Sequence, residues 1–116
     1  IKETAVTGLL VDNFSALIGP DHLEFEGHGT GSSDTGDLSH LMPMVEVKSG
    51  GFHGGLHTAA YGVADEEQAY IVPAKAMAMT AVDLLADHAT VANRILADFT
   101  PKMSKAEYLA CLREVE

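Results

Sequence analysis

Two histidines lie four residues apart in the glycine-rich stretch 50–61, which reads GGFHGGLHTAAY. The imidazoles of His53 and His57 are suited to a metal ion, and zinc commonly takes neutral histidine as a ligand. The two glycine pairs let the backbone turn sharply or approach a ligand closely. An H-x-x-x-H spacing outside a helix is a weak metal signal, so a connecting loop with surface histidines is the alternative interpretation.

The segments on either side place this loop between a strand and a helix. A short apolar run over residues 44–47 precedes the loop, and a long helical pattern begins near Asp65. Open α/β sheets bind their ligands where a strand ends in a loop that leads into a helix. We therefore expect the loop to be the functional centre of the chain.

The composition is that of an ordinary globular domain with an excess of acid. The chain has 116 residues, of which 47% are hydrophobic, and 17 acidic against 7 basic residues give a formal charge of −10. This length predicts a single domain over 1–116. Nucleic acid and anionic membrane surfaces are not expected as partners, since both attract clustered Lys and Arg.

The single cysteine, Cys111, cannot form an internal disulfide, and its helical, apolar surroundings predict a small core residue. No stretch approaches the roughly 20 apolar residues of a membrane helix, and no signal peptide opens the chain. A cytoplasmic location is the expectation. The chain lacks an initiator Met and begins inside a helical pattern, which predicts a piece of a longer polypeptide.

We predict an α/β fold of about five helices with two or three strands. The helical patterns cover 3–18, about 34–42, 65–86, about 87–100 and 104–115, and the strand patterns cover 23–26, 44–48 and 52–53. The apolar residues of the long helix, such as Met77 and Leu85, are expected in the core. The last two helices, over 88–115, should pack as an antiparallel hairpin because their connection is short.

Several helix boundaries carry a local signal. Gly19 and Pro20 end the first helix, and Asp65 caps the long one. Pro73 should kink that long helix or reset its start. Ser104 and Glu107 have the spacing of a capping box.

The loop over 27–36 has the glycine content of a phosphate loop but lacks the lysine that such a loop requires. Ser33 or Asp34 is better explained as the cap of a short helix.

Two segments together resemble a known enzyme family. The first is GSSDTGDLS at 31–39, followed by Pro43, and the second is GGLHT at 54–58, followed by the long Ala- and Met-rich helix. The pair resembles the C-terminal part of the catalytic domain of dizinc amidohydrolases of the aminoacylase/carboxypeptidase type, closest to the aminobenzoyl-glutamate hydrolase branch. The resemblance implies one side of a three-layer α/β/α sandwich.

The resemblance also implies roles for individual residues. His57 matches the last zinc ligand of the family, and Gly54 and Gly55 match a backbone loop beside the metal pair that approaches the substrate. Asp34 matches an acid near the site, with a supporting or capping role. His53 has no counterpart in the family.

The family uses two zinc ions to activate a water molecule and polarise an amide carbonyl, and a glutamate serves as general base. Its H-x-D ligand pair, bridging aspartate and Glu-Glu pair lie in an upstream segment, and nothing in this chain matches them. We therefore expect a C-terminal fragment, inactive alone, of an enzyme that hydrolyses acyl-amino acids or small peptides. Its partners would be the missing N-terminal segment and a small amide substrate. Exposed apolar surface should favour homo-oligomers.

Two alternatives stay open. The first is a non-catalytic acidic interaction module that kept the fold but lost the metal site. The second is a self-contained metal-binding protein that uses His53, His57 and either His28 or Asp34.

Overall fold

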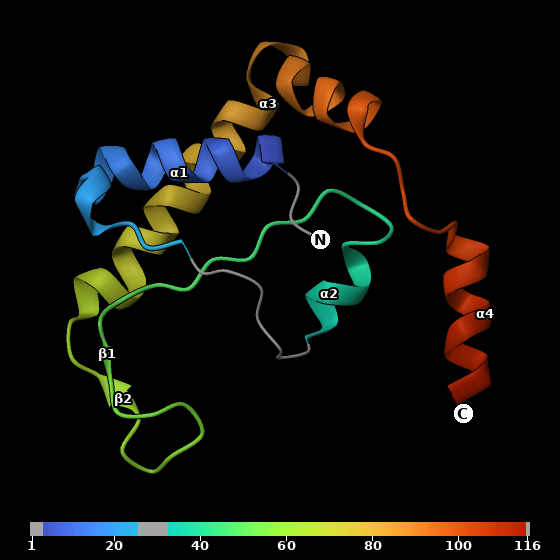
Figure 1. The fold of residues 1–116 in the computed structure, drawn as a ribbon. Coiled ribbons are helices and arrows are strands. Elements are labelled where there is room, and N and C mark those ends of the chain that lie inside the picture. Colours follow the sequence, from blue (N-terminus) through green and yellow to red (C-terminus); the bar gives the residue numbers. More distant parts are fainter. Residues whose placement is uncertain (1–3, 26–32, 116) are drawn as a thin grey trace.

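The computed structural model describes residues 4–25 and 33–115, which form a helix-rich chain with one small antiparallel sheet (Figure 1). The mixed content of helices and strands agrees with the predicted α/β class. The elements, in order, are α1 (Thr4–Ile18), η1 (Pro20–His22), α2 (Asp34–Leu38), β1 (Phe52–His53), β2 (Gly62–Val63), η2 (Glu67–Ile71), α3 (Val72–Asp98) and α4 (Lys105–Val115).

The core lies where α1 crosses the first half of α3 (Figure 1). Leu10 and Phe14 of α1 pack with Val72 and Ala76 of α3, and Ala76 is completely buried. Each large apolar side chain buried in this way contributes roughly 1.5–3 kcal/mol. Partly buried side chains surround this cluster, namely Leu17, Ile18, Leu23 and Val45.

The first helix ends where the sequence predicts. Gly19 adopts a left-handed φ of 87°, and its N–H donates to the Ser15 carbonyl at 2.9 Å. Glycine takes this conformation without steric cost, and Pro20 cannot continue the helix. Pro20 instead begins the short 3₁₀ turn η1.

Pro73, predicted to kink the long helix or reset its start, lies where the π-helical turn η2 changes into α3 without a break in the helical backbone. Asp65 caps the helical region, because its carboxylate accepts from the Gln68 N–H at 3.1 Å. The turn that follows, η2, is a π-helix, and α3 begins at Val72 with Pro73 in its first turn. A proline ring clashes with the carbonyl four residues earlier in a regular helix, so the wider π-helical turn before it accommodates the ring.

A break divides α3 into two halves. Asp87, His88 and Ala89 have φ values of 48°, 56° and 58°, which lie in the left-handed region. The Thr90 hydroxyl donates to the Asp87 carbonyl at 2.5 Å at the start of the second half. The predicted start of a new helix at Asp87 corresponds to this break.

The last helix, α4, begins with the predicted capping box. The Ser104 N–H donates to the Glu107 carboxylate at 2.6 Å, and the Glu107 N–H donates to the Ser104 hydroxyl at 3.2 Å. The antiparallel hairpin predicted over 88–115 is not formed, since α4 stands apart from α3 in Figure 1. The connection before α4 instead contacts the segment that follows α2, because the Lys102 N–H donates to the His40 carbonyl at 2.9 Å.

Only one of the three predicted strands is present in the described residues. β1 pairs with β2, with Phe52 opposite Val63 and His53 opposite Gly62. The prediction of strands at 23–26 and 44–48 is wrong for the residues that the structure describes. Residues 23–25 and 44–48 form no regular ladder. Residue alternation fits one wet and one buried face, but a strand forms only where a partner strand offers its hydrogen bonds.

The helical stretch Glu67–Asp98 corrects the expectation that no segment is long and apolar enough to cross a membrane. Its best 18-residue window has a mean hydropathy of 1.3, and 22% of that window is buried. The helix meets the requirements for a membrane span by length and composition only, and the core helix of a protein outside any membrane meets the same requirements. The break at 86–89 also interrupts the backbone ladder that a spanning helix needs.

Candidate functional site

The loop that carries both histidines is closed at its base by Gly51. The Gly51 carbonyl accepts from the N–H groups of Ala64 and Asp65, at 2.8 and 3.0 Å. Gly51 has a φ of 85°, and a Cβ there would lie 2.5 Å from the Asp65 carbonyl oxygen and 2.6 Å from the Ala69 nitrogen. Glycine is therefore required at this position, and the loop is fixed to the start of the long helix.

Gly54 is required for a close approach within the loop itself. It has a φ of 76°, and a Cβ at this residue would collide with the carbonyl group of Ala60. The resemblance implies that this glycine backbone approaches a substrate, whereas its conformation here is dictated by the opposite side of the same loop. Gly55 has room for a side chain, and its carbonyl accepts from the Thr58 N–H at 3.2 Å and the Thr58 hydroxyl at 2.7 Å.

His57 occupies the third position of the turn over residues 55–58 and has a φ of 63°. A left-handed third residue is the pattern of a type II turn, which normally has glycine there. Histidine at positive φ is uncommon, and such strain clusters at functional sites. The turn holds the exposed His57 in a fixed backbone conformation at the surface.

Side-chain rings pack against the β1–β2 hairpin at Phe52 and at His53. On one face, Phe52 and Tyr61 stack with ring centroids 5.3 Å apart and planes 10° apart. His53 faces Gly62 across the ladder, and a Cβ on Gly62 would lie 2.9 Å from the His53 Nε2. The His53 ring therefore rests on the Gly62 backbone, which gives this histidine a packing role.

The residues present do not make a complete zinc site. In residues 4–25 and 33–115, no three His, Cys, Asp or Glu side chains lie close enough together to hold a metal ion. Catalytic zinc usually needs three protein ligands and an open position. His57 is thus a single candidate ligand in the described part of the chain.

Asp34 is not brought beside the loop. It begins α2, which Figure 1 shows apart from the β1–β2 hairpin. The predicted cap from Ser33 is not made either, since the Ser33 hydroxyl hydrogen-bonds to the Thr35 hydroxyl at 2.6 Å. His28, one member of the alternative metal set, lies outside the described residues.

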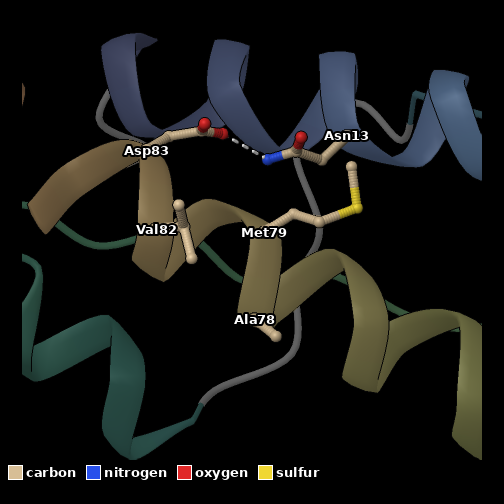
Figure 2. Close-up of a pocket in the computed structure, with 5 residues that line it drawn as sticks. All are labelled: Asn13, Ala78, Met79, Val82 and Asp83. Atoms are coloured by element: carbon tan, nitrogen blue, oxygen red, sulfur yellow. Dashed lines mark hydrogen bonds between the residues drawn. The ribbon is translucent and has the colours of Figure 1, made fainter. Parts of the chain in front are cut away.

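A polar network inside the α1–α3 contact was not predicted (Figure 2). The Asn13 amide donates to the Thr80 hydroxyl at 3.0 Å and to the Asp83 carboxylate at 2.8 Å. This network borders a groove of about 310 Å³ that is also lined by Ala78, Met79 and Val82. The signal in the sequence is Asn13 itself, a polar residue directly before Phe14 on the apolar face of α1.

A second groove, of about 260 Å³, lies between the α2 region and α4. Its lining includes His40, Tyr108 and Cys111. Cys111 is exposed, which corrects its prediction as a core residue, because α4 is not packed against α3. The His40 Nδ1 lies 3.0 Å from the Gly36 carbonyl oxygen, so one ring nitrogen already has a partner.

Comparison with family models, with characterised proteins and with solved structures finds no match for the chain.

Proposed function

We propose that this chain is the C-terminal part of the catalytic domain of a zinc-dependent amidohydrolase, and that His57 is the metal ligand it contributes. The observation that supports this proposal is the left-handed backbone of His57, at φ 63°, in a loop whose base is fixed by Gly51. A strained residue persists only where its surroundings over-determine it. A surface loop without a function would more simply have glycine at this position.

The remaining ligands of a two-zinc site would come from an upstream segment. In this proposal, upstream strands also complete a three-layer α/β/α sandwich on the described helices. The extended segment 44–48 would then gain the strand neighbours that it lacks in the described residues. The chain alone would hold no stable metal pair and would be inactive.

The proposed substrates are amides of acyl-amino acids or small peptides, as the family resemblance implies. This assignment rests on the GSSDTGDLS and GGLHT motifs. Phe52, Leu56 and Tyr61 are the pocket walls that this part of the chain would offer, and they are too generic to select one substrate.

The test uses the polypeptide in which an upstream segment precedes this chain, assayed for zinc-dependent hydrolysis of N-acetyl amino acids and dipeptides. His57→Ala should lower kcat/KM by roughly 100-fold or more, because even outer partners of metal ligands typically cost 10–100-fold. His53→Ala is the matched control, a histidine of the same loop that should retain activity. Activity that survives His57→Ala, or that falls equally with both variants, would contradict the proposal.

The second candidate is the non-catalytic acidic interaction module. The exposed apolar side chains of α3 favour it, since Val82 and Leu85 are 65% and 68% exposed, and a protein partner could cover them. A monomer that binds a protein partner while the longer polypeptide shows no hydrolysis would favour the module.

A further inference from the structure

The backbone at the break in α3 is strained, and the local sequence does not require a break. Ala86 has a ψ of 159°, and the three residues that follow, 87–89, all have left-handed φ and ψ angles. Residues other than glycine are disfavoured in that conformation and normally adopt it singly. Residues 74–100 contain neither proline nor glycine, so neither of these usual causes of a kink explains the break. Contacts outside 86–89 must therefore hold the strained backbone.

The same sequence is suited to one continuous helix. Alanine, the strongest helix former, occurs within the break and on both sides of it. The apolar pattern also continues through the break at spacings of three and four residues, over Val82, Leu85, Ala89, Ala92 and Leu96. Such spacing places residues on one face of a single helix. The two halves of α3 instead point in different directions (Figure 1), so the local preference and the observed backbone disagree.

Side-chain hydrogen bonds and one buried side chain stabilise the bent form. The Thr90 hydroxyl donates to the Asp87 carbonyl at 2.5 Å. The Asn93 amide donates to the His88 carbonyl at 3.4 Å. In a continuous helix these two carbonyls would instead accept from the backbone N–H groups four residues later. The second half of α3 also buries Ile95, which is 6% exposed, and a single helix cannot cover its own isoleucine to that extent. Other parts of the chain therefore cover Ile95, and the direction of the second half decides whether they reach it.

We infer that α3 is a hinge with two states, the bent form of the structure and a continuous helix over residues 72–98 in which residues 86–89 take right-handed angles. The continuous form would relieve the left-handed backbone and complete the backbone hydrogen bonds across the break. It would lose the contacts that bury Ile95. Strain and burial oppose one another, which is the condition for two conformations of similar free energy. The inference uses neither His57 nor the proposed hydrolase function.

The experiment makes the left-handed backbone less favourable and uses NMR to ask whether the helix becomes continuous. A β-branched residue is strongly disfavoured at positive φ but costs little in a right-handed helix. Ala89→Val in the whole chain should therefore gain the Hα–Hβ NOEs from Leu85 to His88 and from Ala86 to residue 89 that a continuous helix gives. Ala92→Val is the matched control, since Ala92 is also partly buried but lies in regular helix, and this variant should retain the break.

Ile95→Ala tests the hinge from the other side and decides the question if Ala89→Val does not fold. It removes the buried side chain that the bent form covers, while alanine suits a continuous helix. The fraction of continuous helix, measured by saturation-transfer NMR at the amides of residues 86–90, should rise roughly ten-fold or more. A left-handed break that persists in folded Ala89→Val, the same NOEs gained in Ala92→Val, or no continuous fraction in Ile95→Ala would each overturn the inference.

Discussion

The N–H of Asp65 donates to the carbonyl oxygen of Gly51 at 3.0 Å, which joins the two ends of the histidine loop. The same Gly51 backbone packs so closely against Asp65 and Ala69 that no side chain fits. The loop is thus part of the start of the long helical region, which is itself capped by Asp65. A rigid base is what a ligand-presenting loop needs, since ordering a mobile loop on binding would cost affinity.

Gly51→Ala should destabilise the chain by about 2 kcal/mol or more, because alanine at φ 85° is strained and its Cβ collides with backbone atoms. Gly50→Ala is the control, since Gly50 has open space around it and no positive φ. Urea unfolding of both variants measures the difference. Equal stabilities would show that Gly51 does not fix the loop.

His57→Gly should be more stable than His57→Ala by about 1 kcal/mol. Both variants lose the imidazole, but only glycine relieves the left-handed backbone at φ 63°. The comparison separates backbone strain from any role of the ring. An alanine variant as stable as the glycine variant, measured by denaturant unfolding, would mean that the turn is not strained.

Because of the break in α3, two alanines three residues apart should respond differently in stability when each is replaced by glycine. Ala89→Gly should leave stability unchanged or raise it, since Ala89 has a φ of 58°. Ala92→Gly should cost about 1 kcal/mol, because Ala92 lies within the regular second half of the helix. Thermal unfolding followed by circular dichroism provides the measurement. If both substitutions destabilise equally, the break is not present in solution.

The capping box of α4 should make its helix sensitive to acid. Hydrogen bonds from the Ser104 backbone N–H, and then from its side chain, hold the pKa of Glu107 below its ordinary value of 4.5. A lowered folded-state pKa means that the stabilisation is present above the unfolded pKa and is lost as the pH falls through the folded pKa. The helical signal of α4 should therefore decline only below pH 4.5.

Glu107→Gln is the control for this acid sensitivity, because a glutamine amide oxygen accepts from Ser104 without titrating. An NMR titration in which the α4 amides of the unmodified chain and the variant respond identically to acid would contradict the account.

The helices were largely predictable from the sequence because their boundaries are set locally. Gly19 ends α1 with its own left-handed backbone, and Ser104 and Glu107 cap α4 within four residues. The strands were not predictable from the sequence, because strand pairing depends on partners that are distant in sequence. Residues 44–48 alternate like a strand but find no ladder among the described residues.

The candidate site was predictable in its location but only partly in its geometry. The histidines and glycines of the loop mark it in sequence, whereas the strain at His57 and the closure by Gly51 depend on three-dimensional contacts. The exposure of Met77 and Cys111 was missed for a related reason. An apolar pattern shows that a face suits burial, but not which element covers it.

In the proposed function, this chain would supply one metal ligand to a site that is completed by an upstream segment. The most direct measurement is a calorimetric zinc titration of the isolated chain and of the polypeptide with its upstream segment, each with His57→Ala as control. The account predicts weak binding without defined stoichiometry by the isolated chain, and tight binding of two zinc ions by the longer polypeptide that His57→Ala impairs. Tight one-to-one binding by the isolated chain, lost in His57→Ala, would contradict it.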